Sequence, residues 1–195
     1  AIEFMEREIV LASERHTGRS TFPREMEGQP VGAYLLITLD SDSEDQLYTL
    51  LEQAAELVLD AGAMDVLVAD SPAKMRDAWA ARSAFLEVIM EETKLLDGLV
   101  IRSFGHAGDG NLHIYECSND LTEEEFKKRV DKFFDLIYKE ASAQGGLVSG
   151  EHGIGSGKIQ YLVESIGETN MALMEGIKRV FDPKMILNPG KVCYR

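Results

Sequence analysis

The sequence has few cysteines, a single tryptophan and fewer basic than acidic residues. Two cysteines among 195 residues are too few for a disulfide framework, which favours a reducing compartment and predicts a cytoplasmic location. Lysine and arginine number 20 against 34 aspartates and glutamates, so the formal net charge is −14. This charge argues against a nucleic-acid surface and against charge-driven binding to anionic membranes. No apolar run approaches the roughly 20 residues of a membrane-spanning helix.

The remaining composition, 45% hydrophobic and 28% charged, is that of a chain that can build a core. Hydrophobic periodicity predicts helices at 2–15, 44–61, 72–90, 122–143, 155–165 and 169–181, and strands at 31–39, 64–69, 99–104, 112–117 and 147–149. Residues 16–30 read as a loop. This order predicts an α+β fold, with a ferredoxin-like antiparallel sheet, helices on one face and a C-terminal helical segment.

Glycine and histidine gather in two short segments. Residues 103–113 read SFGHAGDGNLH, residues 149–158 read SGEHGIGSGK, and together they hold three of the four histidines. Fixing a glycine backbone costs entropy, so this density predicts one site assembled from both segments. A Walker phosphate loop is excluded, because it needs glycine where His152 stands and serine or threonine where Ile159 stands. The dinucleotide fingerprint fails as well, since Lys158 replaces its third glycine.

The two segments offer the ligands of a metal site. His106 and His113 supply imidazole nitrogens, and Glu151 would add a carboxylate. Positions seven apart on a straight strand point to opposite faces, so the chain must fold back at the glycines for the two rings to converge. His152 is a candidate general base, and Asn111 is a candidate for hydrogen bonding a substrate. An ordinary loop or strand role is the alternative for each of these residues.

Three motifs in order resemble a known family. They are GHAGDGNLH, SGEHGIGSGK and FDPKMILNPGKV, and the opening EFMER fits the same pattern. The sequence resembles the C-terminal domain of FAD-linked oxidases, the D-lactate, glycolate and D-2-hydroxyglutarate dehydrogenases of the vanillyl-alcohol-oxidase type. The resemblance covers nearly the whole chain. It implies that residues 1–195 are the substrate-side domain of a flavoenzyme, whose FAD-binding domain normally precedes this one and is absent from the chain.

The resemblance also implies a role for each motif residue. His106, His113 and Glu151 match ligands of a divalent metal, which would be zinc, iron or manganese. The same resemblance makes His152 the base, Asn111 a substrate contact and Asn188 a contact to FAD, with Glu151 and His152 also on the cofactor side. A family W-x-x-R motif matches Trp79 to Arg82, which would make Arg82 a clamp for the substrate carboxylate. A solvated arginine on a helix face is an equally weighted alternative for Arg82.

The implied activity is oxidation of a small D-2-hydroxy acid to the 2-oxo acid, with hydride transfer to FAD. The partners expected from the resemblance are the acid and an electron acceptor such as a quinone or an electron-transfer flavoprotein, and no nucleic acid. A homodimer and a peripheral position at the membrane are both compatible with this activity. A metal-dependent hydrolase using the same His/His/Glu site is the rival enzyme, and a regulatory or assembly module without catalysis is the third alternative.

The junction around Asp97 and Gly98 departs from the family pattern. Family members usually carry a further strand and helix between the W-x-x-R helix and the strand before GHAGDGN. Here residues 86–97 lead almost directly into residues 98–103. Either this chain has lost that segment, together with a lysine and part of the substrate pocket, or the residues that belong there are missing from the sequence and the numbering has been closed up.

Overall fold

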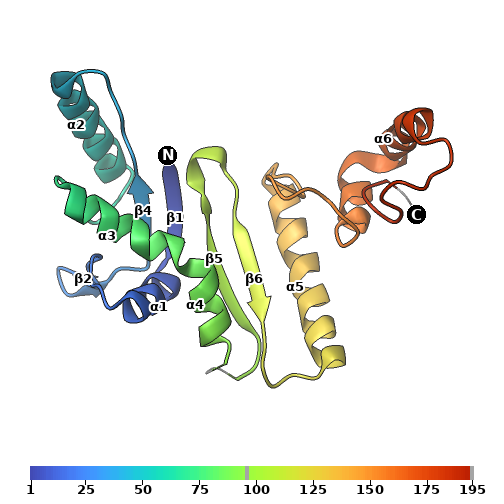
Figure 1. The fold of residues 1–195 in the computed structure, drawn as a ribbon, viewed down its shortest axis with the longest axis horizontal. Coiled ribbons are helices and arrows are strands. Elements are labelled where there is room, and N and C mark those ends of the chain that lie inside the picture. Colours follow the sequence, from blue (N-terminus) through green and yellow to red (C-terminus); the bar gives the residue numbers. More distant parts are fainter. Residues whose placement is uncertain (95–96, 194–195) are drawn as a thin grey trace. The chain divides into compact units, whose positions relative to one another are not determined.

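The computed structural model describes residues 1–94 and 97–193, which form two compact units (Figure 1). The first unit is Ala1–Glu123, and the second begins at Glu124. The first unit holds the β-sheet, and the second is built from long helices and loops. This is the α+β class with an antiparallel sheet that the sequence predicts.

The sheet of the first unit has four antiparallel strands in the order β4-β1-β5-β6. Their bounds are β1 Ile2–Glu6, β4 Ala33–Ile37, β5 Val100–His106 and β6 His113–Cys117. The first strand of the chain is therefore central, and β5 and β6 form a hairpin beside it. In this register Glu3 lies opposite His106, and Phe104 lies opposite His113.

Four helices belong to this unit, α1 Arg7–Thr17, α2 Glu44–Asp60, α3 Pro72–Ser83 and α4 Phe85–Glu92. Serine side chains accept hydrogen bonds from backbone N–H groups at the starts of α2 and α3, and Pro72 opens α3. The core lies between the sheet and helices α1 and α4. Met5, Ile9 and Phe85 are its centre, each with 1% or less of its surface exposed.

Several predicted elements differ from the structure. The entry helix predicted at 2–15 is wrong for its first part, because residues 2–6 form β1 and the helix begins only at Arg7. Five residues are too short a window for the strand period to stand out from the helix that follows. The loop predicted at 16–30 contains the end of α1 and a small ribbon, β2 Glu25–Met26 with β3 Gln29–Pro30.

The strand predictions at 64–69 and 147–149 are also wrong, because both segments follow an irregular backbone path. The side chains of Leu67 and Val68 are 63% and 51% exposed, so this β-branched run packs against little. Strand propensity reflects packing on a pleated surface and is not sufficient by itself. The helix predicted at 72–90 is divided into α3 and α4 at Ala84.

The second unit contains α5 Glu123–Ala143 and α6 Ile159–Phe181. Gly167, with φ 78° and ψ 163°, interrupts α6, which explains why the sequence predicts two helices there. The Tyr161 hydroxyl donates a 2.8 Å hydrogen bond to Asp135 and so joins α6 to α5. Burial and this bond to a carboxylate raise the pKa of Tyr161 to about 12. None of the described helices combines the length and the apolar character that a membrane crossing requires.

The core packing predicts a clear difference between two apolar truncations. Ile9→Ala should lower the free energy of unfolding by about 2–5 kcal/mol, because it opens a cavity where Ile9 is fully buried. Leu57→Ala removes a similar side chain that is 70% exposed, so it serves as the matched control. Urea unfolding of the full-length protein measures both. Equal losses for the two variants would contradict this assignment of the core.

Candidate metal and substrate site

The two histidines of the first glycine segment lie side by side. His106 ends β5, His113 begins β6, and a 3-10 turn over Ala107–Asp109 reverses the chain between them. Their ring centroids are 5.2 Å apart and the ring planes are nearly perpendicular. The expectation that the chain folds back and brings the rings together is therefore confirmed. Two nitrogen donors of this kind at the end of a hairpin are suited to holding a divalent metal.

Asn111 shapes the turn between the histidines. Its Oδ1 accepts a 3.3 Å hydrogen bond from the His106 backbone N–H, and its own N–H donates to the His106 carbonyl at 3.2 Å. These bonds give Asn111 a structural task in addition to the predicted substrate contact, which stays a prediction.

Gly105 allows the close approach that the turn requires. A Cβ added there would lie 2.3 Å from the Asn111 carbonyl oxygen and 2.9 Å from the Leu112 Cα. Both are backbone atoms, so they cannot swing away as a flexible side chain could. The glycine at this position is therefore a packing requirement of the hairpin that carries the two histidines.

Glu3 is a site residue that the sequence analysis missed. Its Oε1 lies 2.9 Å from Nδ1 of His106, and its Oε2 accepts hydrogen bonds from Nη2 and Nε of Arg82 at 2.8 and 3.0 Å. The residue is 5% exposed. Burial would raise the pKa of Glu3, but the hydrogen bonds from His106 and Arg82 and the charge of Arg82 outweigh it and hold the pKa below its usual range. Because the ionised carboxylate only accepts, the proton of this bond belongs to His106 Nδ1.

The only sequence signal for Glu3 is a carboxylate alternating with Met5 in the strand IEFME. A charged residue on the inward-facing side of a short strand is unusual unless it is paired. The pattern becomes visible only when residues 2–6 are read as a strand.

Arg82 lies on α3 beside the two histidines. Its guanidinium carbon is 4.6 Å from the centroid of the Phe104 ring and 5.4 Å from that of Phe85, and its side chain is 15% exposed. The arginine is thus not the solvated helix-face residue of the alternative reading. Its Nε and Nη2 are directed to Glu3, and the clamp for a substrate carboxylate stays a prediction.

Glu151 and His152 belong to the second unit, in the loop between α5 and α6. Both are exposed, and His152 Nε2 lies 3.6 Å from Glu151 Oε1. The Ser149 hydroxyl donates to the Gly153 carbonyl at 3.1 Å and closes a short turn around them. Their roles as metal ligand and base stay predictions.

Asn188 follows a turn that is held by two charged residues. Asp182 is 6% exposed, and its carboxylate accepts from the backbone N–H groups of Ile186 and Leu187 at 3.1 and 2.9 Å. Lys178 donates to that carboxylate at 3.0 Å and to the Leu187 carbonyl at 2.7 Å. This network leads the chain into Asn188, whose φ is 47°, and its predicted contact with FAD is not tested by the structure.

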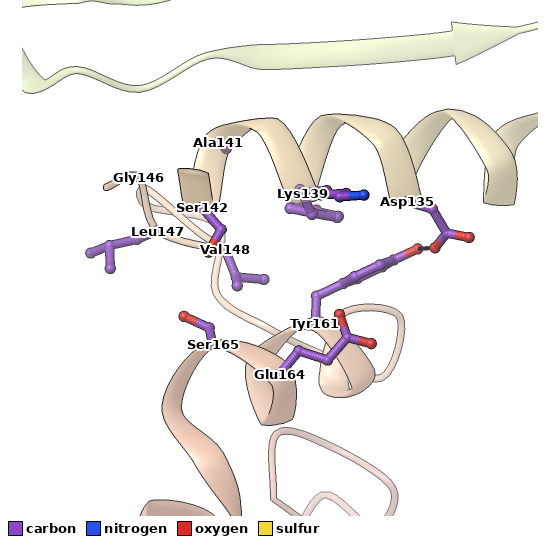
Figure 2. A pocket seen from close by; sticks show the side chains of 11 residues that line it. Asp135, Lys139, Ala141, Ser142, Gly146, Leu147, Val148, Tyr161, Glu164 and Ser165 are labelled. Carbon is purple, nitrogen blue, oxygen red and sulfur yellow. Dashed lines mark hydrogen bonds between the residues drawn. The ribbon is translucent and has the colours of Figure 1, made fainter. Parts of the chain in front are cut away.

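The second unit also contains a cavity of about 370 Å³ between α5 and α6 (Figure 2). Its lining includes Lys139, Ser142, Tyr161, Glu164 and Ser165, and the Tyr161 hydroxyl points to Asp135 at its rim. None of the predicted site residues belongs to this lining. The cavity is therefore separate from the residues that carry the candidate chemistry.

Comparison with known families gives a direct match. The family model described as FAD linked oxidases, C-terminal domain, matches residues 1–98 and 88–192. The chain belongs to this family.

Curated relatives carry related names. The chain is 52% identical over 220 residues to a D-lactate dehydrogenase of Anaerostipes hadrus, with 100% of this chain and 46% of that protein covered. A D-lactate dehydrogenase of Archaeoglobus fulgidus is 33% identical, with 98% and 45% covered. Glycolate oxidase subunit GlcD of Bacillus subtilis is 36% identical over 60% of this chain and 25% of that protein. The chain thus spans about half the length, or less, of these relatives.

The matches also bear on the junction near Asp97. The alignment with the Anaerostipes protein runs over 220 residues although this chain has 195, so that relative carries residues that this chain lacks. The two segments that match the family model overlap at residues 88–98. Both findings agree with the departure from the family pattern at this junction, of which residues 95 and 96 lie outside the described residues.

The close contact at Gly105 predicts a selective sensitivity. Gly105→Ala should lower the free energy of unfolding by about 1–3 kcal/mol, because the new methyl group would overlap backbone atoms of the hairpin. Gly108→Ala is the matched control, since its Cβ would lie 3.6 Å from Ile2 in ordinary contact. Urea unfolding of each full-length variant tests this, and similar stability of the two would refute the steric account.

Proposed function

We propose that this chain forms the substrate side of an FAD-linked dehydrogenase that oxidises a D-2-hydroxy acid to the 2-oxo acid. The observation that carries the proposal is the paired His106 and His113 rings, 5.2 Å apart, in a chain of the FAD-linked oxidase family. The names of its relatives, D-lactate dehydrogenase and glycolate oxidase subunit, support a hydroxy acid as the substrate class.

The proposed metal ligands are His106, His113 and Glu151. The donor chemistry of two imidazoles and a carboxylate suits zinc, iron or manganese. His106 already gives its Nδ1 to Glu3, so Nε2 is the nitrogen that would coordinate. A ligating histidine that donates its other N–H to a carboxylate is the usual arrangement in metal sites, so these residues fit the group. The proposed role of Glu151 as the third metal ligand is supported by its position in a Glu-His-Gly motif that resembles that of the family.

The chemistry then divides among named residues. A bound metal would polarise the substrate hydroxyl as a Lewis acid. His152 takes the hydroxyl proton, a task for which an imidazole is suited near neutral pH. Arg82 binds the substrate carboxylate and Asn111 a substrate oxygen, while Asn188 lies toward the flavin. FAD, when bound, would accept the α-carbon hydrogen as hydride, so that with the proton taken by His152 the acid loses two electrons and two hydrogens in total.

The reduced enzyme must pass its electrons to an acceptor. We propose a quinone or an electron-transfer flavoprotein in that role, with the protein in the cytoplasm and a peripheral membrane position for the quinone case. A homodimer is compatible with either acceptor. Sedimentation of the full-length protein with vesicles tests the membrane position, and reoxidation of the reduced flavin by a quinone or by an electron-transfer flavoprotein distinguishes the two acceptors.

An anaerobic visible spectrum of the full-length protein tests the activity. Addition of one D-2-hydroxy acid from a panel should bleach the flavin band, whereas its L-enantiomer should leave the band unchanged. The acid that bleaches the band fastest then identifies the substrate. A folded full-length preparation without flavin would refute the proposal and favour a metal-dependent hydrolase.

Two histidine substitutions separate the base from the ligands. His152→Ala should slow flavin reduction by about 10²–10⁴-fold, the usual contribution of a general base, with metal content near that of the wild type. His106→Ala should release the metal. His16→Ala is the control, because His16 contacts Glu91 on α4 and has no part in the proposed site. Rapid-scan spectra and metal analysis measure all three, and loss of metal from His152→Ala would make His152 a ligand or a structural support of the site.

A further inference from the structure

The carboxylate of Glu3 joins three elements of the first unit. Glu3 lies on β1, His106 on β5 and Arg82 on α3. One oxygen contacts the histidine at 2.9 Å, and the other accepts both hydrogen bonds from the arginine. Each oxygen therefore has its own partner, and neither contact competes with the other.

The pairing of β1 with β5 brings Glu3 and His106 next to each other. Glu3 and His106 are directly opposite in the β1–β5 ladder, so their side chains emerge on the same face of the sheet. The glutamate is 5% exposed, and a buried carboxylate of this kind is costly unless charged or polar partners surround it. A side chain held on both oxygens and buried by its neighbours has little freedom to rotate.

Arg82 is restrained in turn. Its guanidinium lies over the Phe104 ring at 4.6 Å, and the same ring stacks on His113 at a centroid distance of 5.4 Å. Phe104 thus contacts both the arginine that holds Glu3 and the second histidine. Of the two rings of the candidate metal site, His106 contacts Glu3 and His113 stacks on Phe104.

We propose that Glu3 is the positioning residue of the metal site, which keeps the proton of His106 on Nδ1 and presents Nε2 to the metal. This inference rests on the metal-binding part of the proposed function and adds a residue to it. Glu3 does not coordinate the metal. Arg82 keeps the glutamate oriented, so the metal affinity depends on Arg82 only through Glu3.

Metal affinity of the full-length protein tests the inference. The metal is removed, and Zn²⁺ is returned in competition with a chromophoric chelator. Glu3→Gln should weaken Zn²⁺ binding by about 10–100-fold, the usual loss when the partner of a ligating histidine is changed. Glu6→Gln is the matched control, because Glu6 lies on the same strand, accepts from Ser103 at 2.9 Å and lies 3.9 Å from Arg102, neither of which is a proposed metal ligand. Its Zn²⁺ affinity should equal that of the wild type.

A second pair of measurements separates positioning from stability. Glu3→Gln leaves the Arg82 charge without its partner, so this variant could lose stability for that reason alone. The double variant Glu3→Gln with Arg82→Gln replaces the ion pair by two neutral amides and should recover the melting temperature but not the Zn²⁺ affinity. In the metal-free wild type, ¹⁵N spectra of labelled histidine should show His106 protonated at Nδ1, and Glu3→Gln should shift that signal toward a mixture of tautomers.

The outcomes distinguish the inference from the function on which it rests. Wild-type protein that binds no Zn²⁺ would overturn the metal site and the inference together. Wild-type binding with unchanged affinity in Glu3→Gln would overturn the inference alone. Recovery of affinity in the double variant would show that Glu3 acts only through stability, which also overturns it.

Discussion

The carboxylate of Glu3, paired with Arg82 and hydrogen-bonded to His106, is the contact at which three elements of the first unit meet. It joins the central strand, a covering helix and the hairpin at a place where water is largely excluded. Removing either partner of such a group leaves a buried charge unpaired, which costs more than the pair gains by forming. The same contact sets the orientation of a candidate metal ligand, so fold and chemistry share one carboxylate.

The β5–β6 hairpin then brings His113 next to the His106 ring that Glu3 holds. Gly105 lets the backbone of Asn111 approach closely, and Asn111 closes the turn with bonds to His106. A straight strand would have sent the two imidazoles to opposite faces. The turn places them together instead, and Phe104 packs against the second ring. Gly105 and Asn111 therefore each have a geometric task in the hairpin.

The sequence predicts which residues carry the candidate chemistry, but it does not show which residues distant in the chain lie beside them. The two histidines, the α+β class and the break of the last helix near Gly167 all follow from local patterns of residues. Glu3 escaped notice because its significance depends on a cross-strand neighbour 103 positions away. Residues 64–69 were taken for a strand because composition reports propensity but not the presence of a neighbouring strand.

The segment 64–69 shows what a strand requires beyond β-forming residues. A run such as 64–69 needs a strand beside it to satisfy its backbone hydrogen bonds in a sheet. Its irregular path and the exposure of Leu67 and Val68 are what a β-forming run shows when no such neighbour covers it. The histidine hairpin has such a neighbour, because β5 pairs with β1 in the sheet and Glu3 on β1 contacts His106.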